Sequence, residues 1–233
     1  MTYPREYTVS RCPSGAPPGA SPDAYPLDRE WNETPWSSTP CLGLDHFMGE
    51  RPEHRPVTEA RILYDEAGLS VSFRVEDRYV LATAEKHQDS VCIDSCVEFF
   101  FTPGPNVAEG YFNIECNCGG TVLFHHQLSR GLHSRPMSLE SIGAMGVRHS
   151  LPSRVQPEMP GPVTWTVRYR VPYEELERLA PVVRPAPGVI WRANVYKCAD
   201  RSSRPHWLTW SLVDRPKPDF HRPDYFGILR FGR

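Results

Sequence analysis

The chain lacks the features that mark several large classes of protein. No apolar run approaches the roughly 18 residues that a membrane-spanning helix needs, so the sequence predicts no membrane span. Lys and Arg number 26 against 28 acidic residues, for a formal net charge of −2, and they form no basic stripe for nucleic acid or an anionic membrane. Phosphate loops, dinucleotide fingerprints and Ser-His-Asp signatures are also missing. These absences argue against nucleic-acid, membrane, nucleotide-dependent and serine-hydrolase functions.

The N-terminus lacks the apolar segment of a secretory signal. Met1–Arg5 contains no apolar run, which predicts a cytoplasmic protein, or a secreted or periplasmic one if a leader has been removed. Cysteine is too sparse for a disulfide scaffold, and the seven cysteines are an odd number, which slightly favours a reducing compartment. No low-complexity linker divides the middle of the 233 residues, so one folded domain is expected.

Proline is concentrated near the N-terminus. Residues 11–26 contain five prolines and two glycines, which predicts an extended arm over residues 1–26, with a single domain over residues 27–233. Trp31 and Trp36 follow the arm at a spacing that fits neither a strand nor a long helix. Because aromatic side chains carry a large apolar area, we expect these two to close one end of the core.

Alternating apolar and polar residues predict β-strands through the rest of the chain. The alternation is clearest in 69–77 and 164–171, and one short helix is expected after Pro172. Strands separated by turns, with one short helix, predict an all-β fold, an antiparallel β-sandwich. Its predicted core contains Val71, Phe73, Phe99, Ile114, Val167, Trp191 and Trp210.

Two predicted strands have a polar face opposite their apolar one. In 111–117, Asn113 and Glu115 alternate with apolar residues, and in 189–197 Arg192 and Asn194 do the same. Amide, carboxyl and guanidinium groups supply the donors and acceptors that sugar hydroxyls require. The pattern predicts either a sugar-binding face or a solvated sheet face.

Six motifs occur in an order that resembles carbohydrate-binding module family 9. They are Trp36, Tyr64-Asp65 before Leu69–Phe73, Asp94–Phe100, Tyr111–Glu115, Trp191–Asn194 and Phe220–Gly227. The resemblance covers residues 27–233. It implies a DOMON-like, jelly-roll-like sandwich that binds sugars without cleaving them, as an accessory in polysaccharide breakdown, often with structural calcium.

The same resemblance implies a sugar slot between two aromatic rings. The second ring corresponds to Phe220, whereas the first falls near Cys92 and Ile93, neither of which is aromatic. Trp207 is a further candidate for stacking, and His221 for a hydrogen bond. The full candidate set is Asn113, Glu115, Arg192, Asn194, Trp207, Phe220 and His221 for a saccharide chain end, with Asp77 and Asp94 for calcium.

Another interpretation is a glycoside hydrolase. Glu98 and Glu115 could serve as the paired carboxylates of such an enzyme. The acid of the pair needs a raised pKa in a cleft, and no neighbouring residue in the sequence predicts one.

Bound metal or haem is a third possibility. Haem would need His or Met ligands on an open sheet face, but His133, Met137 and Met145 lie in the irregular segment 133–162. For zinc, Cys116 and Cys118 are about 7 Å apart on an extended strand, near a Gly-Gly turn. Cys92 and Cys96 would be about 13 Å apart on a strand, too far for one ion.

Overall fold

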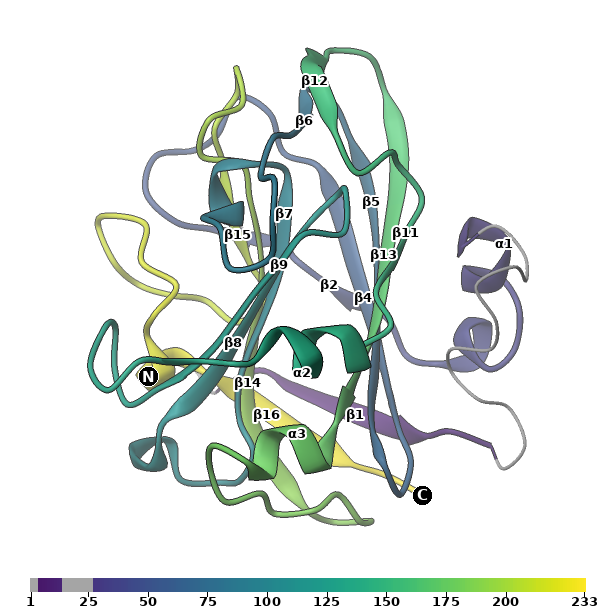
Figure 1. The fold of residues 1–233 in the computed structure, drawn as a ribbon, viewed down its shortest axis with the longest axis vertical. Helices are drawn as coiled ribbons and strands as arrows, with labels where there is room; N and C mark the ends of the chain where they lie inside the picture. Colours follow the sequence, from purple (N-terminus) through teal and green to yellow (C-terminus); the bar gives the residue numbers. More distant parts are fainter. Residues whose placement is uncertain (1–3, 14–26) are drawn as a thin grey trace.

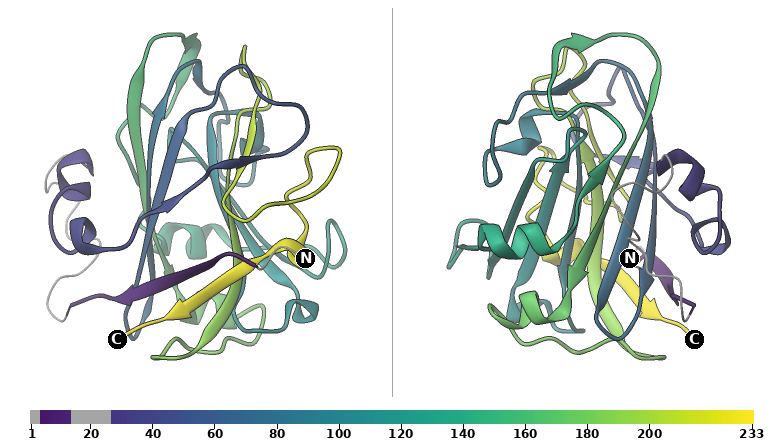
Figure 2. Two further views of the ribbon diagram at one scale, coloured as in Figure 1. Left: turned by 180° about the vertical axis from the view of Figure 1, so that it is seen from behind. Right: turned by 45° about the vertical axis from the view of Figure 1, so that its right-hand side comes forward.

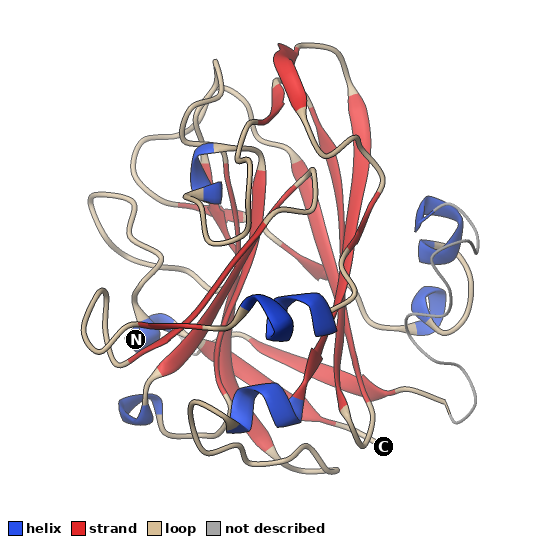
Figure 3. Cartoon of the chain, in the orientation of Figure 1, coloured by secondary structure: helices blue, strands red, loops and turns tan. Residues whose placement is uncertain are grey.

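The computed structural model describes residues 4–13 and 27–233, and its strands form two layers packed face to face (Figures 1 and 3). The first layer contains β7 (Cys96–Thr102), β8 (Tyr111–Asn117), β9 (Val122–Gln127), β10 (Arg135–Pro136), β14 (Ile190–Cys198), β15 (Trp207–Thr209), β16 (Gly227–Phe231) and β3 (His46–Phe47). The second contains β2 (Leu42–Gly43), β4 (Val57–Tyr64), β5 (Gly68–Asp77), β11 (Arg148–His149) and β13 (Val163–Pro172). A separate ribbon pairs β6 (Val80–Ala82) with β12 (Val155–Met159).

Strand β1 (Glu6–Arg11) connects the layers. Its residues 6–9 pair in parallel with β16, and residues 10–11 pair in parallel with β4, so one continuous sheet curls into both layers. The predicted arm is therefore wrong for Glu6–Arg11, where Tyr7 and Val9 alternate inward and are buried. Residues 14–26 of that arm lie outside the described residues. Apart from the pairs made by β1, the strand pairs of the described chain run antiparallel, as predicted.

The core lies between the two layers and matches the predicted one. All seven predicted residues are at most 3% exposed and belong to one apolar cluster. Aromatic rings fill much of it: the ring centroids of Phe101 and Trp191 are 5.5 Å apart, and those of Trp191 and Phe231 are 5.3 Å apart. Period-two alternation was sufficient to identify this core because burial of one strand face is a local pattern.

The described residues contain three short α-helices, where one was predicted. The predicted helix is α3 (Tyr173–Glu177), which places Tyr173 and Leu176 in the core. The additional helices are α1 (Leu27–Trp31) and α2 (Leu139–Ala144), together with four 3-10 turns at Trp36–Ser38, Val91–Ile93, Val107–Glu109 and Pro223–Tyr225. Helix α2 lies inside the segment predicted to be irregular, and with α3 it covers one edge of the gap between the layers (Figure 1). None of the described helices is long and apolar enough to cross a membrane.

The two tryptophans near the N-terminus cover a sheet face. Both Trp31 and Trp36 are 3% exposed. Trp31 ends α1 and Trp36 begins the 3-10 turn after it, and α1 lies on the outer side of the second layer (Figure 1). There the Arg61 guanidinium is 4.2 Å from the Trp31 ring centroid, and that of Arg168 is 4.3 Å from the Trp36 ring. The prediction of burial is confirmed, whereas the predicted position at one end of the core is wrong.

The outer face of the first layer is buried as well. Every residue of β7 and β8 is buried, on both faces. The segment 211–226 runs over this outer face, in yellow in Figures 1 and 2. It contributes Val213, Phe220 and Phe226 to a second apolar cluster, where they meet Phe100 and Tyr111 of the sheet. The predicted polar sheet face is therefore covered by protein and is not open to solvent.

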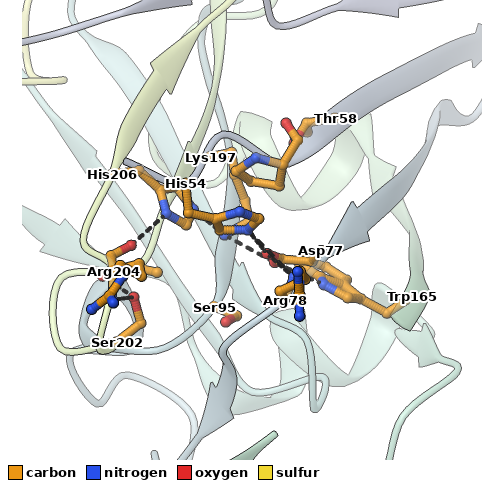
Figure 4. A network of polar contacts seen from close by, with 12 residues as sticks. His54, Thr58, Asp77, Arg78, Ser95, Trp165, Lys197, Ser202, Arg204 and His206 are labelled. Carbon is orange, nitrogen blue, oxygen red and sulfur yellow. Dashed lines mark hydrogen bonds and ion pairs between the residues drawn. The ribbon is translucent and has the colours of Figure 1, made fainter. Parts of the chain in front are cut away.

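A buried ion pair joins the two layers through the core (Figure 4). The Lys197 ammonium of β14 is 3.5 Å from the Asp77 carboxylate of β5, and both side chains are fully buried. Lys197 also donates to His206 Nε2 at 2.8 Å, while His54 Nε2 lies 2.8 Å from Asp77. Burial opposes ionisation of Asp77, but Lys197 and His54 together hold its pKa well below the usual value.

We expect Lys197→Met to lower the free energy of unfolding by about 3–5 kcal/mol, because it leaves a buried carboxylate without its cation. Urea denaturation at neutral pH measures the loss. The double variant with Asp77→Asn should lose less than the sum of the two single variants. Arg74→Met, which removes the partly exposed Arg74–Glu76 pair, is the control and should cost less than about 1 kcal/mol. A Lys197→Met loss no larger than that of the control would contradict the role of the buried pair.

Candidate functional site

A cavity of about 110 Å³ lies on the outer side of the first layer. Its floor comes from three neighbouring strands, which contribute Glu98, Glu115 and Cys198. Its walls come from loops and from β15: Cys92, Arg130, Asp200, Trp207, Pro218, Asp219, Phe220 and His221. The volume is several times what one water molecule occupies, so the cavity can hold part of a small polar ligand.

Strand register sets the floor. Glu98 of β7 lies directly opposite Glu115 of β8, and on its other side opposite Tyr196 of β14. Because successive side chains point to opposite faces, Phe99 and Ile114 enter the core while the two carboxyls point outward. Side chains directly opposite in an antiparallel pair have Cβ atoms about 4.5–5.5 Å apart, so the two carboxyls are neighbours.

The two carboxyls hold their protons unusually tightly. Burial, and then the nearby charge of Glu115, raises the pKa of Glu98 well above its usual value. Burial also raises the pKa of Glu115 to about 7, although a hydrogen bond from Asn113 Nδ2 at 3.0 Å works in the opposite direction. The Cys198 thiol donates to Glu98 at 3.1 Å. Near neutral pH the pair therefore offers both a proton donor and an acceptor to a ligand.

Two aromatic side chains border the cavity. Phe220 is 9% exposed and stacks on Tyr196, with ring centroids 4.2 Å apart and planes at 11°. Trp207 is partly exposed, and its indole Nε1 donates to Asp200 at 2.7 Å, which fixes the ring. Aromatic rings of this kind can pack against the C–H faces of a sugar.

His221 is held as a neutral imidazole. Burial, assisted by the charge of Arg130, lowers its pKa to about 4. Its Nδ1 lies 2.9 Å from the Tyr111 hydroxyl and 3.3 Å from Gln127 Nε2. The amide nitrogen of Gln127 can donate a hydrogen bond but cannot accept one. Nδ1 is thus an acceptor, which places the ring proton on Nε2 and makes that nitrogen a donor.

Four of the seven sugar-binding residues predicted from the sequence line the cavity: Glu115, Trp207, Phe220 and His221. Asn113 does not line it, but supports Glu115 and accepts from Gln127 at 2.8 Å. The remaining two residues, Arg192 and Asn194, do not line the cavity. Arg192 donates to the carbonyls of Phe226 and Gly227, and Asn194 donates to the Ser211 carbonyl at 2.9 Å. They anchor the ends of the covering segment.

Sequence reasoning missed several residues of the walls. Arg130, Asp200 and Asp219 come from loops, where no periodicity indicates which way a side chain points. Cys198 ends a strand with a visible alternation, and it could have been found by extending the pattern of Asn194 and Tyr196 by two residues.

The two residues predicted to bind calcium do not line the cavity, and their surroundings do not fit that ion. Asp77 accepts from Trp165 Nε1 at 3.2 Å and from the Arg78 amide at 2.8 Å, besides its contacts with Lys197 and His54. Asp94 is fully buried and accepts from Thr83, Ala84 and Asn117. Calcium requires about six to eight oxygen ligands, whereas hydrogen-bond donors surround both carboxylates.

The fold and the cavity together define a β-sandwich of the carbohydrate-binding-module class, with polar and aromatic groups gathered at one hollow of a sheet. Within that class, the chain belongs to carbohydrate-binding family 9, whose model matches residues 39–231. No curated protein sequence matches the chain.

Solved structures share the architecture. A Bacteroides uniformis ATCC 8492 protein, to which carbohydrate binding has been attributed, is 25% identical with a TM-score of 0.83, over 98% of this chain and 99% of that one. A family 9 module from Caldicellulosiruptor kristjanssonii in complex with cellotriose is 14% identical with a TM-score of 0.62, over 98% and 95% of the two chains. The glucose complex of a family 9 module from the same organism is 15% identical with a TM-score of 0.61, over 98% of this chain and 97% of that one. At these lower identities the likeness concerns the fold.

We expect Glu115→Gln to weaken the pH dependence of stability between pH 4.5 and about 7, the window set by the raised pKa of Glu115. In this window the folded protein binds a proton that the unfolded chain releases, so the free energy of unfolding falls as pH rises. Glu115 contributes on the order of 3 kcal/mol to that fall.

Urea denaturation at several pH values across this window measures the effect. Glu140→Gln, on an exposed part of α2, is the control and should follow the wild type. If Glu115→Gln also follows the wild type, the carboxyl pair is not protonated as described.

Proposed function

We propose that the cavity binds the end of a saccharide chain without cleaving it. The observation that carries the proposal is the meeting of a buried carboxyl pair with Phe220 and Trp207 in one hollow, in a chain of a carbohydrate-binding family. A pyranose ring has apolar C–H faces and a rim of hydroxyls, so it needs both kinds of contact. The cellotriose and glucose complexes of the C. kristjanssonii module support this class of ligand.

The shape of the surface supports recognition of a chain end. The small cavity has a floor of strand residues, and its volume of about 110 Å³ suits part of one terminal sugar ring and excludes a longer stretch of chain. A second hollow of about 490 Å³ shares Trp207 and Pro218 with it and is lined by polar residues that include Glu50, Arg51 and Arg204. The terminal ring would enter the small cavity, and the following sugar units would lie over Trp207 in the larger hollow.

The polar groups of the cavity are of the right types for hydroxyls. Glu98 and Glu115 provide a donor and an acceptor while they share a proton, and His221 Nε2 provides a further donor. Asp219 and Arg130 add an acceptor and a cation at the rim. We further propose the DOMON-like description of the sandwich, on the basis of its two layers and its curled sheet.

Glycoside hydrolysis is the second candidate, and one observation favours it. Glu98 and Glu115 lie side by side in a cavity and have raised pKa values, which the sequence alone did not predict. A retaining hydrolase, however, needs one carboxylate ionised as nucleophile beside its acid. Here the same burial raises the pKa of both groups, which suits hydrogen bonding better than nucleophilic attack.

Removing either aromatic wall should weaken saccharide binding. We expect Phe220→Ala and Trp207→Ala each to cost about 1–3 kcal/mol of binding free energy, by analogy with base stacking on aromatic side chains. Isothermal titration calorimetry with cellotriose, glucose and a panel of other oligosaccharides measures the affinities. Leu139→Ala, at a side chain 65% exposed on α2, should bind as the wild type does. Because Phe220 also packs on Tyr196, circular dichroism must confirm that each variant is folded. Folded variants with unchanged affinity would place the saccharide elsewhere.

The protein should release no reducing sugar from polysaccharides. A reducing-end assay over pH 4–8 tests this against a broad substrate panel, with Glu98→Gln and Glu115→Gln alongside the wild type. Activity in the wild type that both variants lose would replace the binding proposal with hydrolysis. Activity that persists in both variants would be assigned to a contaminating enzyme.

A further inference from the structure

Two thiols and a carboxyl meet beneath the cavity. The Sγ atoms of Cys96 and Cys198 and a carboxylate oxygen of Glu98 all lie within 4.8 Å of one another, and the three residues are at most 2% exposed. Strand register produces the cluster: Cys96 of β7 lies directly opposite Cys198 of β14, and Glu98 follows two residues later on the same face. Glu98 and Cys198 also line the cavity, so the cluster is reachable from it.

We propose that Cys96, Cys198 and Glu98 bind one thiophilic divalent cation, Zn²⁺ being the best fit. Thiolates select zinc over the harder magnesium and calcium ions, and zinc also accepts a carboxylate oxygen. Ligand atoms on a tetrahedral zinc ion lie about 4 Å apart, so the three groups need only small movements to reach one ion. Glu98 and Cys198 line the cavity together with Glu115, so a fourth ligand such as Glu115 would come from that side.

The other cysteines do not form an equivalent set. Cys116 and Cys118, the pair considered from the sequence, belong to the apolar core, where Cys116 alternates with Glu115 and points to the opposite face of β8. Cys92 lines the cavity, and its backbone carbonyl oxygen lies 3.5 Å from Cys198 Sγ. The zinc ligands thus come from strands distant in sequence, which no Cys spacing could indicate.

Two further carboxyl groups lie near the cluster. Glu115 and Asp200 lie beside it in the cavity, whereas Lys197, the neighbour of Cys198, points to the other face and pairs with Asp77. Burial raises the pKa of both thiols, so without a metal they remain protonated. A bound divalent ion supplies the missing positive charge and releases protons as it binds. Metal binding requires no sugar, so it can be tested separately from the proposed function, although both proposals use Glu98.

Cobalt titration of the reduced, metal-free protein, without sugar, tests the site. We expect one Co²⁺ to bind per chain, with thiolate-to-cobalt charge-transfer absorption and the visible bands of a tetrahedral ion, and Zn²⁺ to displace it. Cys96→Ser and Cys198→Ser should each remove the charge-transfer absorption or lower it by about half. Cys41→Ser, at an exposed cysteine, is the matched control and should keep the full spectrum.

Three results would overturn the proposal. The first is a wild-type protein, with its thiols reduced, that gives no thiolate-to-cobalt absorption. The second is an unchanged spectrum in folded Cys96→Ser and Cys198→Ser proteins. The third is absorption lost only in Cys92→Ser, which would assign the ion to another thiol. Should the Cys96 and Cys198 variants fail to fold, Glu98→Gln keeps both thiols and should weaken Co²⁺ binding at least tenfold, and unchanged affinity would count against the site.

Discussion

Strands β7 and β8, and β14 from Ala193 onward, are buried on both faces, and the site follows from that constraint. Their inner faces pack as an ordinary apolar core around Phe99, Ile114 and Val195. Their outer faces carry carboxyls, thiols and amides under the segment 211–226, where each polar group needs a partner because burial without one is costly. Asn194 illustrates the solution, since its side chain donates to the Ser211 carbonyl and accepts from the Ser211 amide.

The covering segment satisfies most of this outer face but leaves the carboxyl pair at the floor of a cavity. Phe220 and Trp207 are the aromatic side chains that close the cavity from the loop side. The same arrangement thus produces two properties at once: a carboxyl pair with raised pKa values, and an apolar wall beside it. Lys197 lies on the inner face of β14, and its pairing with Asp77 allows this charged side chain to be buried in the core.

The alternation of apolar and polar residues along the sequence predicted those features that depend on single strands. The long strands, the sandwich and all seven core residues follow from alternation, whereas the short strands β10, β11 and β12 lie in the segment predicted to be irregular. Glu115, Phe220, Trp207 and His221 were found because alternation or a family motif placed them. Strand β1 was missed because its pairing with β16 joins the two ends of the chain. Arg192 was wrongly predicted to lie in the site. Alternation shows which face of the strand its side chain points to, but not that the side chain donates to the carbonyls of Phe226 and Gly227 there. The raised pKa values depend on register and covering loops, which no single stretch of sequence contains.

The most direct test of saccharide binding in this cavity is a crystal structure of the protein soaked with cellotriose, or with whichever oligosaccharide binds best by calorimetry. Our account predicts electron density for a terminal sugar ring between Phe220 and Trp207, with hydroxyls within hydrogen-bond distance of Glu98, Glu115 or His221. Density for the saccharide at a different surface, with this cavity holding only water, would contradict it.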